Sequence, residues 1–183
     1  LKPGYPNACF NLSLIKKLKG DYKYGLELYE SRWEKDDPVI PSCYPKIKKI
    51  KLNEIREDNN LLIVSEQGLG DTIQYMRYIP ILKKRGMKVS FCAQTKLHSL
   101  IKESGIDSNP LTPEDAIRVS SGNWIPLLSL MKYLDISPVK PIIVDSYIHS
   151  SNKLNNKWKH ILSKEKKPVI GLNWQGNPDV EKG

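Results

Sequence analysis

The chain has 183 residues, a formal net charge of +9 and 39% hydrophobic residues, which is enough for one ordinary domain with a small addition. No apolar run approaches the roughly 20 residues that a membrane-spanning helix needs, so we expect no membrane span. Cys9, Cys43 and Cys92 are an odd number of cysteines at wide spacings, which favours reduced thiols in a cytoplasmic protein over a structural zinc site.

The positive charge comes mostly from lysine, because only five of the 29 basic residues are arginine. Proteins that bind nucleic acid usually use arginine for base and phosphate contacts and aromatic residues for stacking. We therefore expect solvated, lysine-rich faces and do not favour nucleic acid as a partner. An anionic small ligand or glycan stays open as an alternative.

Residues 6–35 have the pattern of two consecutive helices. An apolar stripe in the first helix is followed by Gly20, a residue that favours the C-terminal end of a helix. Asp21 is expected to cap the second helix, and the small Gly25 allows the two helices to pack closely. The second helix is expected to bury one face, which carries Tyr22, Leu26, Tyr29 and Trp33.

This predicted hairpin resembles a tetratricopeptide repeat, because Asn11-Leu12, Gly20-Asp21-Tyr22, Gly25, Tyr29 and Pro38 fall at that motif's spacing. Arg32 departs from the motif, which prefers a small residue there. Helical repeats need about three neighbours to bury a core, so the resemblance implies the last unit of an array or its cap. Such a unit would bind a protein partner. An ordinary helical hairpin packed on the next domain stays open as the alternative.

The segment from Leu61 to Val64 is four apolar residues in a row and predicts a short strand buried on both faces. Gly68 and Gly70 follow, where the backbone can turn sharply and a ligand can approach it closely. Asp71 stands where a helix N-cap is expected, and apolar residues after it recur at helical spacing. A strand, a glycine loop and a helix in this order are typical of ligand sites in open α/β sheets. A plain turn capped by Asp71 is the alternative.

The remaining chain alternates between strand and helix patterns, which predicts parallel βαβ units and a Rossmann-like sheet. A strand from Lys51 is expected to lead into the central one. The further predicted elements are a strand at 87–93, a helix through Leu97 and Ile101 closed by Gly105, a short strand at 115–119, an apolar loop at 124–131 running into a helix, a helix at 152–162 and a strand at 168–174.

Two stretches resemble glycosyltransferase family 9, the heptosyltransferases of lipopolysaccharide synthesis and their tetratricopeptide-fused relatives. The first is 61–80, with the core Glu66-Gln-Gly-Leu-Gly-Asp-Thr-Ile-Gln74 and Arg77-Tyr-Ile-Pro80, and the second is Ile170-Gly-Leu-Asn-Trp-Gln-Gly-Asn-Pro178. The resemblance implies a GT-B architecture, in which one Rossmann-like domain holds the acceptor and a second holds the nucleotide sugar. The implied parts are the hairpin at 1–37, a linker at 38–50, an acceptor-side domain at 51–167 and the start of a donor-side domain at 168–183.

By this resemblance Asp71 matches the proposed general base of an inverting transfer, which would take the proton of the acceptor hydroxyl. Gln175, Gly176 and Asn177 match the donor-side loop. Because the second domain has barely begun at Gly183, we expect residues 1–183 alone to be inactive and to bind nucleotide sugars weakly. No cofactor is expected besides the nucleotide sugar as co-substrate.

Other polar residues near the loop are candidates for sugar contacts. Gln67, Gln74 and Tyr75 carry hydrogen-bonding groups suited to hydroxyls, and Ser129 is a candidate to line the same cleft. The three histidines show no metal-ligand spacing with cysteine, aspartate or glutamate, so no metal site is expected. Two other classes stay open: a non-catalytic interaction scaffold built on the repeat-like hairpin, and a basic binder of nucleic acid or anionic glycans.

Overall fold

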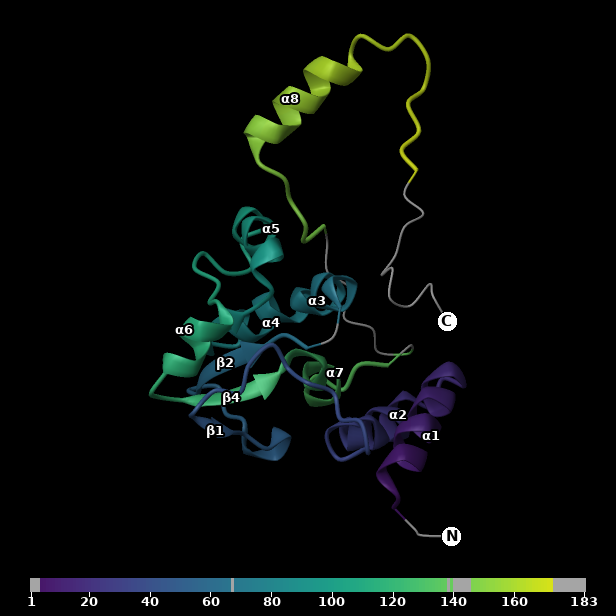
Figure 1. The fold of residues 1–183 in the computed structure, drawn as a ribbon, viewed down its shortest axis with the longest axis vertical. Helices are drawn as coiled ribbons and strands as arrows, with labels where there is room; N and C mark the ends of the chain where they lie inside the picture. The colour runs from purple at the N-terminus through teal and green to yellow at the C-terminus, as the bar shows by residue number, and fades with distance from the viewer. Residues whose placement is uncertain (1–3, 67, 138, 140–145, 173–183) are drawn as a thin grey trace. The chain divides into compact units, whose positions relative to one another are not determined.

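The computed structural model describes residues 4–66, 68–137, 139 and 146–172 (Figure 1). The chain divides into two compact units, Leu1–His149 and Ser150–Gly183. The first unit contains the helical hairpin and the sheet together. The residues that match the donor-side loop, 175–177, lie outside the described residues.

The first unit is built on a four-stranded sheet in which every neighbouring pair of strands is parallel. The strand order is β1-β4-β2-β3, with bounds Lys48–Lys49 for β1, Asn60–Val64 for β2, Lys88–Cys92 for β3 and Asn123–Pro126 for β4. In the register of the sheet, Ile63 lies between Phe91 and Ile125. The predicted parallel α/β sheet is confirmed and is consistent with a Rossmann-like fold.

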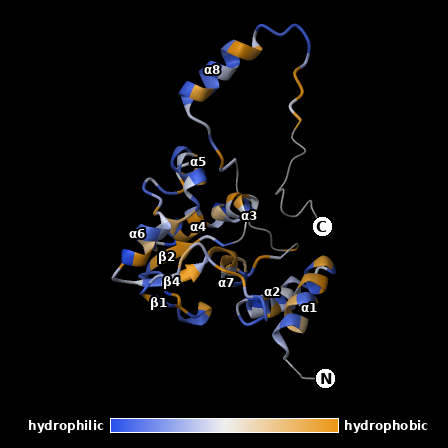
Figure 2. Ribbon diagram, in the orientation of Figure 1, coloured by the Kyte–Doolittle hydropathy of each residue, from blue (hydrophilic) through white to orange (hydrophobic). Residues whose placement is uncertain are grey.

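Alternate side chains of a strand point to opposite faces of the sheet, and in β2 the side chains on both faces are buried. Leu61 and Ile63 belong to the larger core cluster, with the helices that follow β2 and with the hairpin. Leu62 and Val64 belong to a second cluster with Trp124. Figure 2 shows the hydrophobic residues gathered in β2 and β4. The continuous apolar run of β2 is therefore explained by burial on two sides.

The single helix predicted after the glycine loop is in fact three pieces. They are α3 (Leu69–Tyr75), a 3₁₀ turn η3 (Met76–Tyr78) and α4 (Ile79–Lys84). Pro80 lies in the first turn of α4 and has no N–H to donate to the carbonyl of Met76, four residues earlier. The tighter 3₁₀ turn takes that place. Gly86, with φ of 91°, ends the run as predicted.

Of the two elements predicted directly after β3, the helix is confirmed and the strand is wrong. After the 3₁₀ turn η4 (Thr95–Leu97), helix α5 (His98–Glu103) is closed by Gly105 as expected. The segment predicted as a strand at 115–119 is instead helix α6 (Pro113–Arg118). The Thr112 side chain caps it by accepting a hydrogen bond from the Asp115 amide, so local capping outweighs the β-branched residues.

The apolar segment predicted as a loop at 124–131 begins with a strand. Its first residues form β4 and pair with β1 and β2, and a 3₁₀ turn η5 (Leu127–Ser129) and helix α7 (Leu130–Tyr133) follow. Gly122 precedes β4 with φ of 89°, and a Cβ there would lie 2.5 Å from the carbonyl oxygen of Asn60. The close approach of β4 to β2 therefore requires glycine at this position.

The N-terminal helices form a hairpin, as predicted. Helix α1 (Pro6–Leu18) and helix α2 (Tyr22–Tyr29) are joined at Gly20, with φ of 82°, and α2 runs into a 3₁₀ turn η1 (Glu30–Trp33). A Cβ on Gly25 would lie 2.8 Å from Cγ of Lys17 and 3.2 Å from the carbonyl oxygen of Ser13. The predicted close packing at Gly25 is confirmed. The assignment of the hairpin as a tetratricopeptide repeat stays a prediction.

The segment predicted as a linker, 38–50, packs on the sheet. Pro41, Cys43, Pro45 and Ile50 are buried. The Ser42 amide donates to the Ser65 carbonyl at 2.8 Å. The strand expected from Lys51 is displaced: β1 lies just before this residue, and a 3₁₀ turn η2 (Leu52–Glu54) follows it. A two-residue strand is too short to leave a periodic pattern in the sequence.

The second unit contains helix α8 (Asn152–Leu162), capped by the Ser151 side chain, which accepts from the Leu154 amide. The strand predicted at 168–174 is not formed at 168–172, where the chain has no regular secondary structure and is exposed; positions 173 and 174 lie outside the described residues. A strand needs a neighbour for its backbone groups, and residues 168–172 have none among the described strands. No helix in the described part of the chain is both long and apolar enough to cross a membrane.

Candidate functional site

The candidate site lies at the carboxyl ends of the central strands. From β2 the chain runs through α3 and α4 to β3 on one side, whereas β4, which also neighbours β2, lies on the other side. The strand order thus reverses direction at β2. In open α/β sheets such a switch point forms a crevice at the carboxyl ends of the strands, where ligands bind. The glycine loop follows β2 at this end of the sheet.

Asp71 is the third residue of α3, and the N-cap is Gly68, so the prediction that Asp71 is the N-cap is wrong. The Asp71 side chain still serves the helix start, because its Oδ2 accepts a hydrogen bond from the Gly68 amide at 3.3 Å. This arrangement is one half of a capping box, in which a carboxylate in the first turn reaches back to the N-cap. Asp71 therefore has a structural contact that uses only one carboxylate oxygen among the described residues.

The fold does not require glycine at either position of the loop. Gly68 has φ of −78°, and Gly70 lies inside α3 without the positive φ that would demand glycine. A Cβ on Gly68 would meet only Oδ2 of Asp71, at an ordinary 3.5 Å, and a Cβ on Gly70 would meet no described atom within 4 Å. The backbone beside Asp71 is therefore exposed and open, as the approach of a ligand would need.

Thr72 joins the loop to the neighbouring strand. It is fully buried, and its hydroxyl donates to Oε1 of Gln94, which follows β3, at 3.0 Å. The same hydroxyl lies 3.3 Å from the Gly68 carbonyl oxygen. The carboxyl ends of β2 and β3 are thus tied together behind the loop. Neither Thr72 nor Gln94 was predicted from the sequence as a site residue.

Tyr75 lies one turn after Asp71 on α3 and is half-buried. Burial, with a smaller contribution from the nearby Tyr29 and Asp71, raises the pKa of its hydroxyl to about 12. The group stays protonated at neutral pH, so it is able to donate a hydrogen bond. Gln74 is exposed on the same helix, whereas Gln67 lies outside the described residues. The structure therefore places Tyr75 on the same face of α3 as Asp71 and leaves the roles of the two glutamines as predictions.

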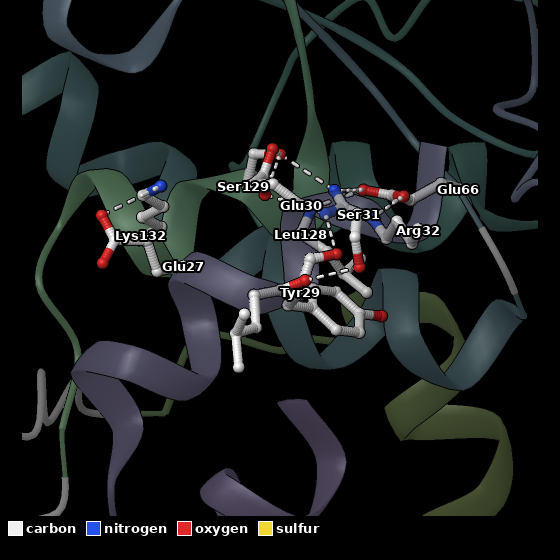
Figure 3. Close-up of polar contacts among 10 residues, drawn as sticks. Glu27, Tyr29, Glu30, Ser31, Arg32, Glu66, Leu128, Ser129 and Lys132 are labelled. Carbon is white, nitrogen blue, oxygen red and sulfur yellow. Dashed lines mark hydrogen bonds and ion pairs between the residues drawn. The ribbon is translucent and has the colours of Figure 1, made fainter. Parts of the chain in front are cut away.

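A buried charge cluster adjoins the loop on its other side (Figure 3). Arg32 of η1 and Glu66, two residues before Gly68, are both fully buried and form a two-pronged ion pair with Nε–Oε2 of 2.9 Å and Nη2–Oε1 of 3.0 Å. Glu66 also accepts the Leu128 amide at 3.0 Å. The hairpin thus places a guanidinium at the carboxyl ends of β2 and β4.

All five N–H groups of Arg32 have an acceptor. Besides the two bonds to Glu66, Nη1 donates to Oε1 of Glu30 at 2.8 Å and to the Tyr29 carbonyl at 3.2 Å, and Nη2 donates to Oγ of Ser129 at 2.9 Å. Two carboxylates and one hydroxyl therefore enclose the cation. A buried guanidinium is tolerated only when its donors are satisfied in this way.

Ser129 belongs to this cluster. It is 1% exposed, and its hydroxyl donates to the Glu30 carboxylate at 2.9 Å while accepting from Arg32. Ser129 therefore has a structural role in the charge cluster, which competes with its predicted role in substrate binding. Arg32 had been noted only as a departure from a repeat motif, and the sequence offered no sign that Glu66, 34 positions later, is its partner.

A cavity of about 520 Å³ lies beside the charge cluster. Its lining includes Glu30, Lys49, Ser129 and Lys132, but none of residues 68–71. The walls carry both carboxylates and ammonium groups, so their charge selects neither an anion nor a cation. The open surface at the glycine loop and this cavity are separate features of the first unit.

The described residues contain no cluster of histidine, cysteine, aspartate and glutamate that would hold a metal ion. Comparisons with protein-family models, with curated proteins and with solved structures give no match to this chain. The class of protein that the structure itself defines is an α/β domain with a Rossmann-like parallel sheet, joined to a helical hairpin through a buried ion pair.

Proposed function

We propose that residues 1–149 are the acceptor-binding half of an inverting glycosyltransferase that uses a nucleotide sugar. The observation that carries this proposal is the position of Asp71: a carboxylate at the carboxyl end of the central strand, at the switch point, beside two glycines that the fold does not require. The resemblance of the loop to glycosyltransferase family 9 gives the chemistry. The acceptor is a glycan or a protein hydroxyl.

In the proposed reaction the hydroxyl oxygen of the acceptor attacks the anomeric carbon of the sugar. The new C–O bond forms as the bond to the nucleoside diphosphate breaks, and the hydroxyl proton passes to the Asp71 carboxylate. In this proposal the Tyr75 hydroxyl, which is protonated at neutral pH, donates a hydrogen bond to the same ligand. The departing diphosphate needs donors from a second domain, for which residues 175–177 are the proposed first loop. No metal or further cofactor enters this proposal.

An amide NMR titration of the chain with mono- and oligosaccharides tests where a ligand binds. We expect shifts of the Gly70 and Thr72 amides, and we expect Gly70→Met to abolish them because its side chain fills the open space beside Asp71. Lys84→Met, which adds the same side chain to an exposed position of α4, is the matched control and should change nothing. Sugar-dependent shifts confined to other parts of the chain would contradict the proposal.

An interaction scaffold is the second candidate, because helix α1 carries exposed apolar side chains. Leu14, Ile15 and Leu18 are 40%, 53% and 88% exposed. Exposed apolar groups that lie together favour contacts with another protein. A scaffold predicts that Ile15→Lys and Leu18→Lys weaken a protein contact and that Gly70→Met leaves it unchanged. The glycosyltransferase proposal predicts the reverse pattern for sugar binding.

A further inference from the structure

The glycine loop is exposed, whereas the chain that leads into it is fixed. The Ser65 amide donates to the Cys92 carbonyl at 2.9 Å, and the Ser65 carbonyl accepts from the Ser42 amide at 2.8 Å. The next residue, Glu66, is held by its side chain through Arg32 and Leu128. Among the described residues, these contacts therefore hold the chain up to Glu66, and Gly68 and Gly70 are exposed.

The group that holds Glu66 comes from the hairpin and is itself held rigidly. The guanidinium carbon of Arg32 lies 4.6 Å from the centres of both the Tyr29 and Trp33 rings. Glu30 and Ser129 take up donors that Glu66 does not use. Two aromatic rings and five hydrogen bonds thus fix the planar guanidinium of Arg32. Because the guanidinium is fixed, it defines the position of the Glu66 carboxylate that it binds.

The stability of the fold does not by itself account for this arrangement. Removing two charges from water is costly, and pairs of well-packed apolar residues are often as stable as a buried ion pair. A buried ion pair does, however, fix one geometry, because its hydrogen bonds are directional. A cation supplied by the hairpin at the start of the glycine loop therefore makes the position of the loop depend on the docked hairpin.

We infer that Arg32 is a positioning residue: by gripping Glu66 it holds the glycine loop, and with it Asp71, in the geometry that binds the ligand. By this inference, residues 4–33 are part of the site and are not an independent module. The ligand-binding role of the loop rests on the proposed function, but the grip of Arg32 on the loop does not. Loop order in the protein without ligand is therefore the quantity to measure.

Amide hydrogen exchange of the chain without ligand tests the inference at Gly68 and at Thr72, whose amide donates to the Gly68 carbonyl at 3.1 Å. In Arg32→Met we expect exchange at both amides to accelerate about tenfold or more beyond the change produced by global unfolding. Amides of Ile63 and Phe91 in the sheet should follow global unfolding alone. Unchanged loop exchange in a folded Arg32→Met protein would overturn the inference.

Two further variants keep the test decisive where Arg32→Met folds poorly. In Arg32→Met/Glu66→Met both charges are removed, so a purely structural role predicts that loop exchange returns to the wild-type rate together with stability. The inference predicts that loop exchange stays fast. Glu30→Gln, a milder change to the grip, should accelerate loop exchange more than Glu27→Gln, whose carboxylate has only a 3.8 Å contact with Lys132. Equal effects of these two would overturn the inference.

Discussion

Replacing Arg32 with methionine should be among the most destabilising single changes in the first unit. The substitution removes all five hydrogen bonds of the guanidinium and leaves Glu66 with one of its three donors, the Leu128 amide. Breaking a fully buried pair in this way costs about 3–5 kcal/mol, because the remaining carboxylate is buried without a counter-charge. For a unit of this size about 2–4 °C of melting temperature is lost per kcal/mol, so we expect a decrease of roughly 6–20 °C.

Urea unfolding followed by circular dichroism measures this loss. The matched control is Lys132→Met, which breaks a contact of 3.8 Å between partly exposed groups and should cost less than about 1 kcal/mol. Arg32→Met/Glu66→Met should recover most of the stability, because no uncompensated charge is left. A loss below about 1 kcal/mol in Arg32→Met would refute the reasoning, because it would mean that Arg32 is not buried and paired as described.

Three other changes have defined outcomes. Gly25→Ala should cost about 1–3 kcal/mol in urea unfolding, because its Cβ would lie 3.1 Å from the backbone nitrogen of Lys17; an unchanged midpoint would contradict the close helix packing. Gly70→Ala should stabilise the unit by about 0.5–1 kcal/mol, since the site is helical and open, and a clear loss would contradict the open geometry. Burial raises the pKa of Tyr75 to about 12. The stabilising contribution of its protonated hydroxyl to the free energy of unfolding is therefore complete below pH 10 and is lost as the pH rises through 12. Between pH 10 and pH 12 the free energy of unfolding of the wild type should therefore fall by about 1–2 kcal/mol more than that of Tyr75→Phe. Parallel curves of unfolding free energy against pH for the two proteins would show that the hydroxyl is solvated.

Local signals in the sequence predicted the parts of the fold that local physics decides. The four apolar residues of β2 indicated a strand buried on both faces, and Gly20, Gly86 and Gly105 end helices where their positive φ is needed. The same kind of signal was available at Thr112, where a capping residue precedes a proline and two acidic residues. The prediction of a strand at 115–119 did not use this signal, and the segment is helix α6.

Contacts between distant positions could not be predicted from one sequence. Arg32 and Glu66 are 34 positions apart, and Arg32 and Ser129 are 97 apart. Their residue types fit many exposed positions equally well, and only the docking of the hairpin brings them together. For the same reason Ser129 was predicted as a cleft residue, although its hydroxyl is engaged by two charged groups in the structure. Asp71 was predicted as the N-cap from the residues next to it, but the N-cap is Gly68 and Asp71 is the third residue of α3.

The most direct test of the proposed function is the rate of sugar transfer from a nucleotide sugar by the complete protein that contains residues 1–183, with Asp71→Asn compared with wild type. Asp115→Asn is the matched control, because Asp115 is also the third residue of a helix and also supports its first turn. We predict that Asp71→Asn lowers the rate about 10²–10⁴-fold while the free energy of unfolding stays within about 0.5 kcal/mol of wild type, and that Asp115→Asn leaves the rate unchanged. A near wild-type rate in Asp71→Asn would contradict the assignment of Asp71 as the base and leave it only its contact with the Gly68 amide.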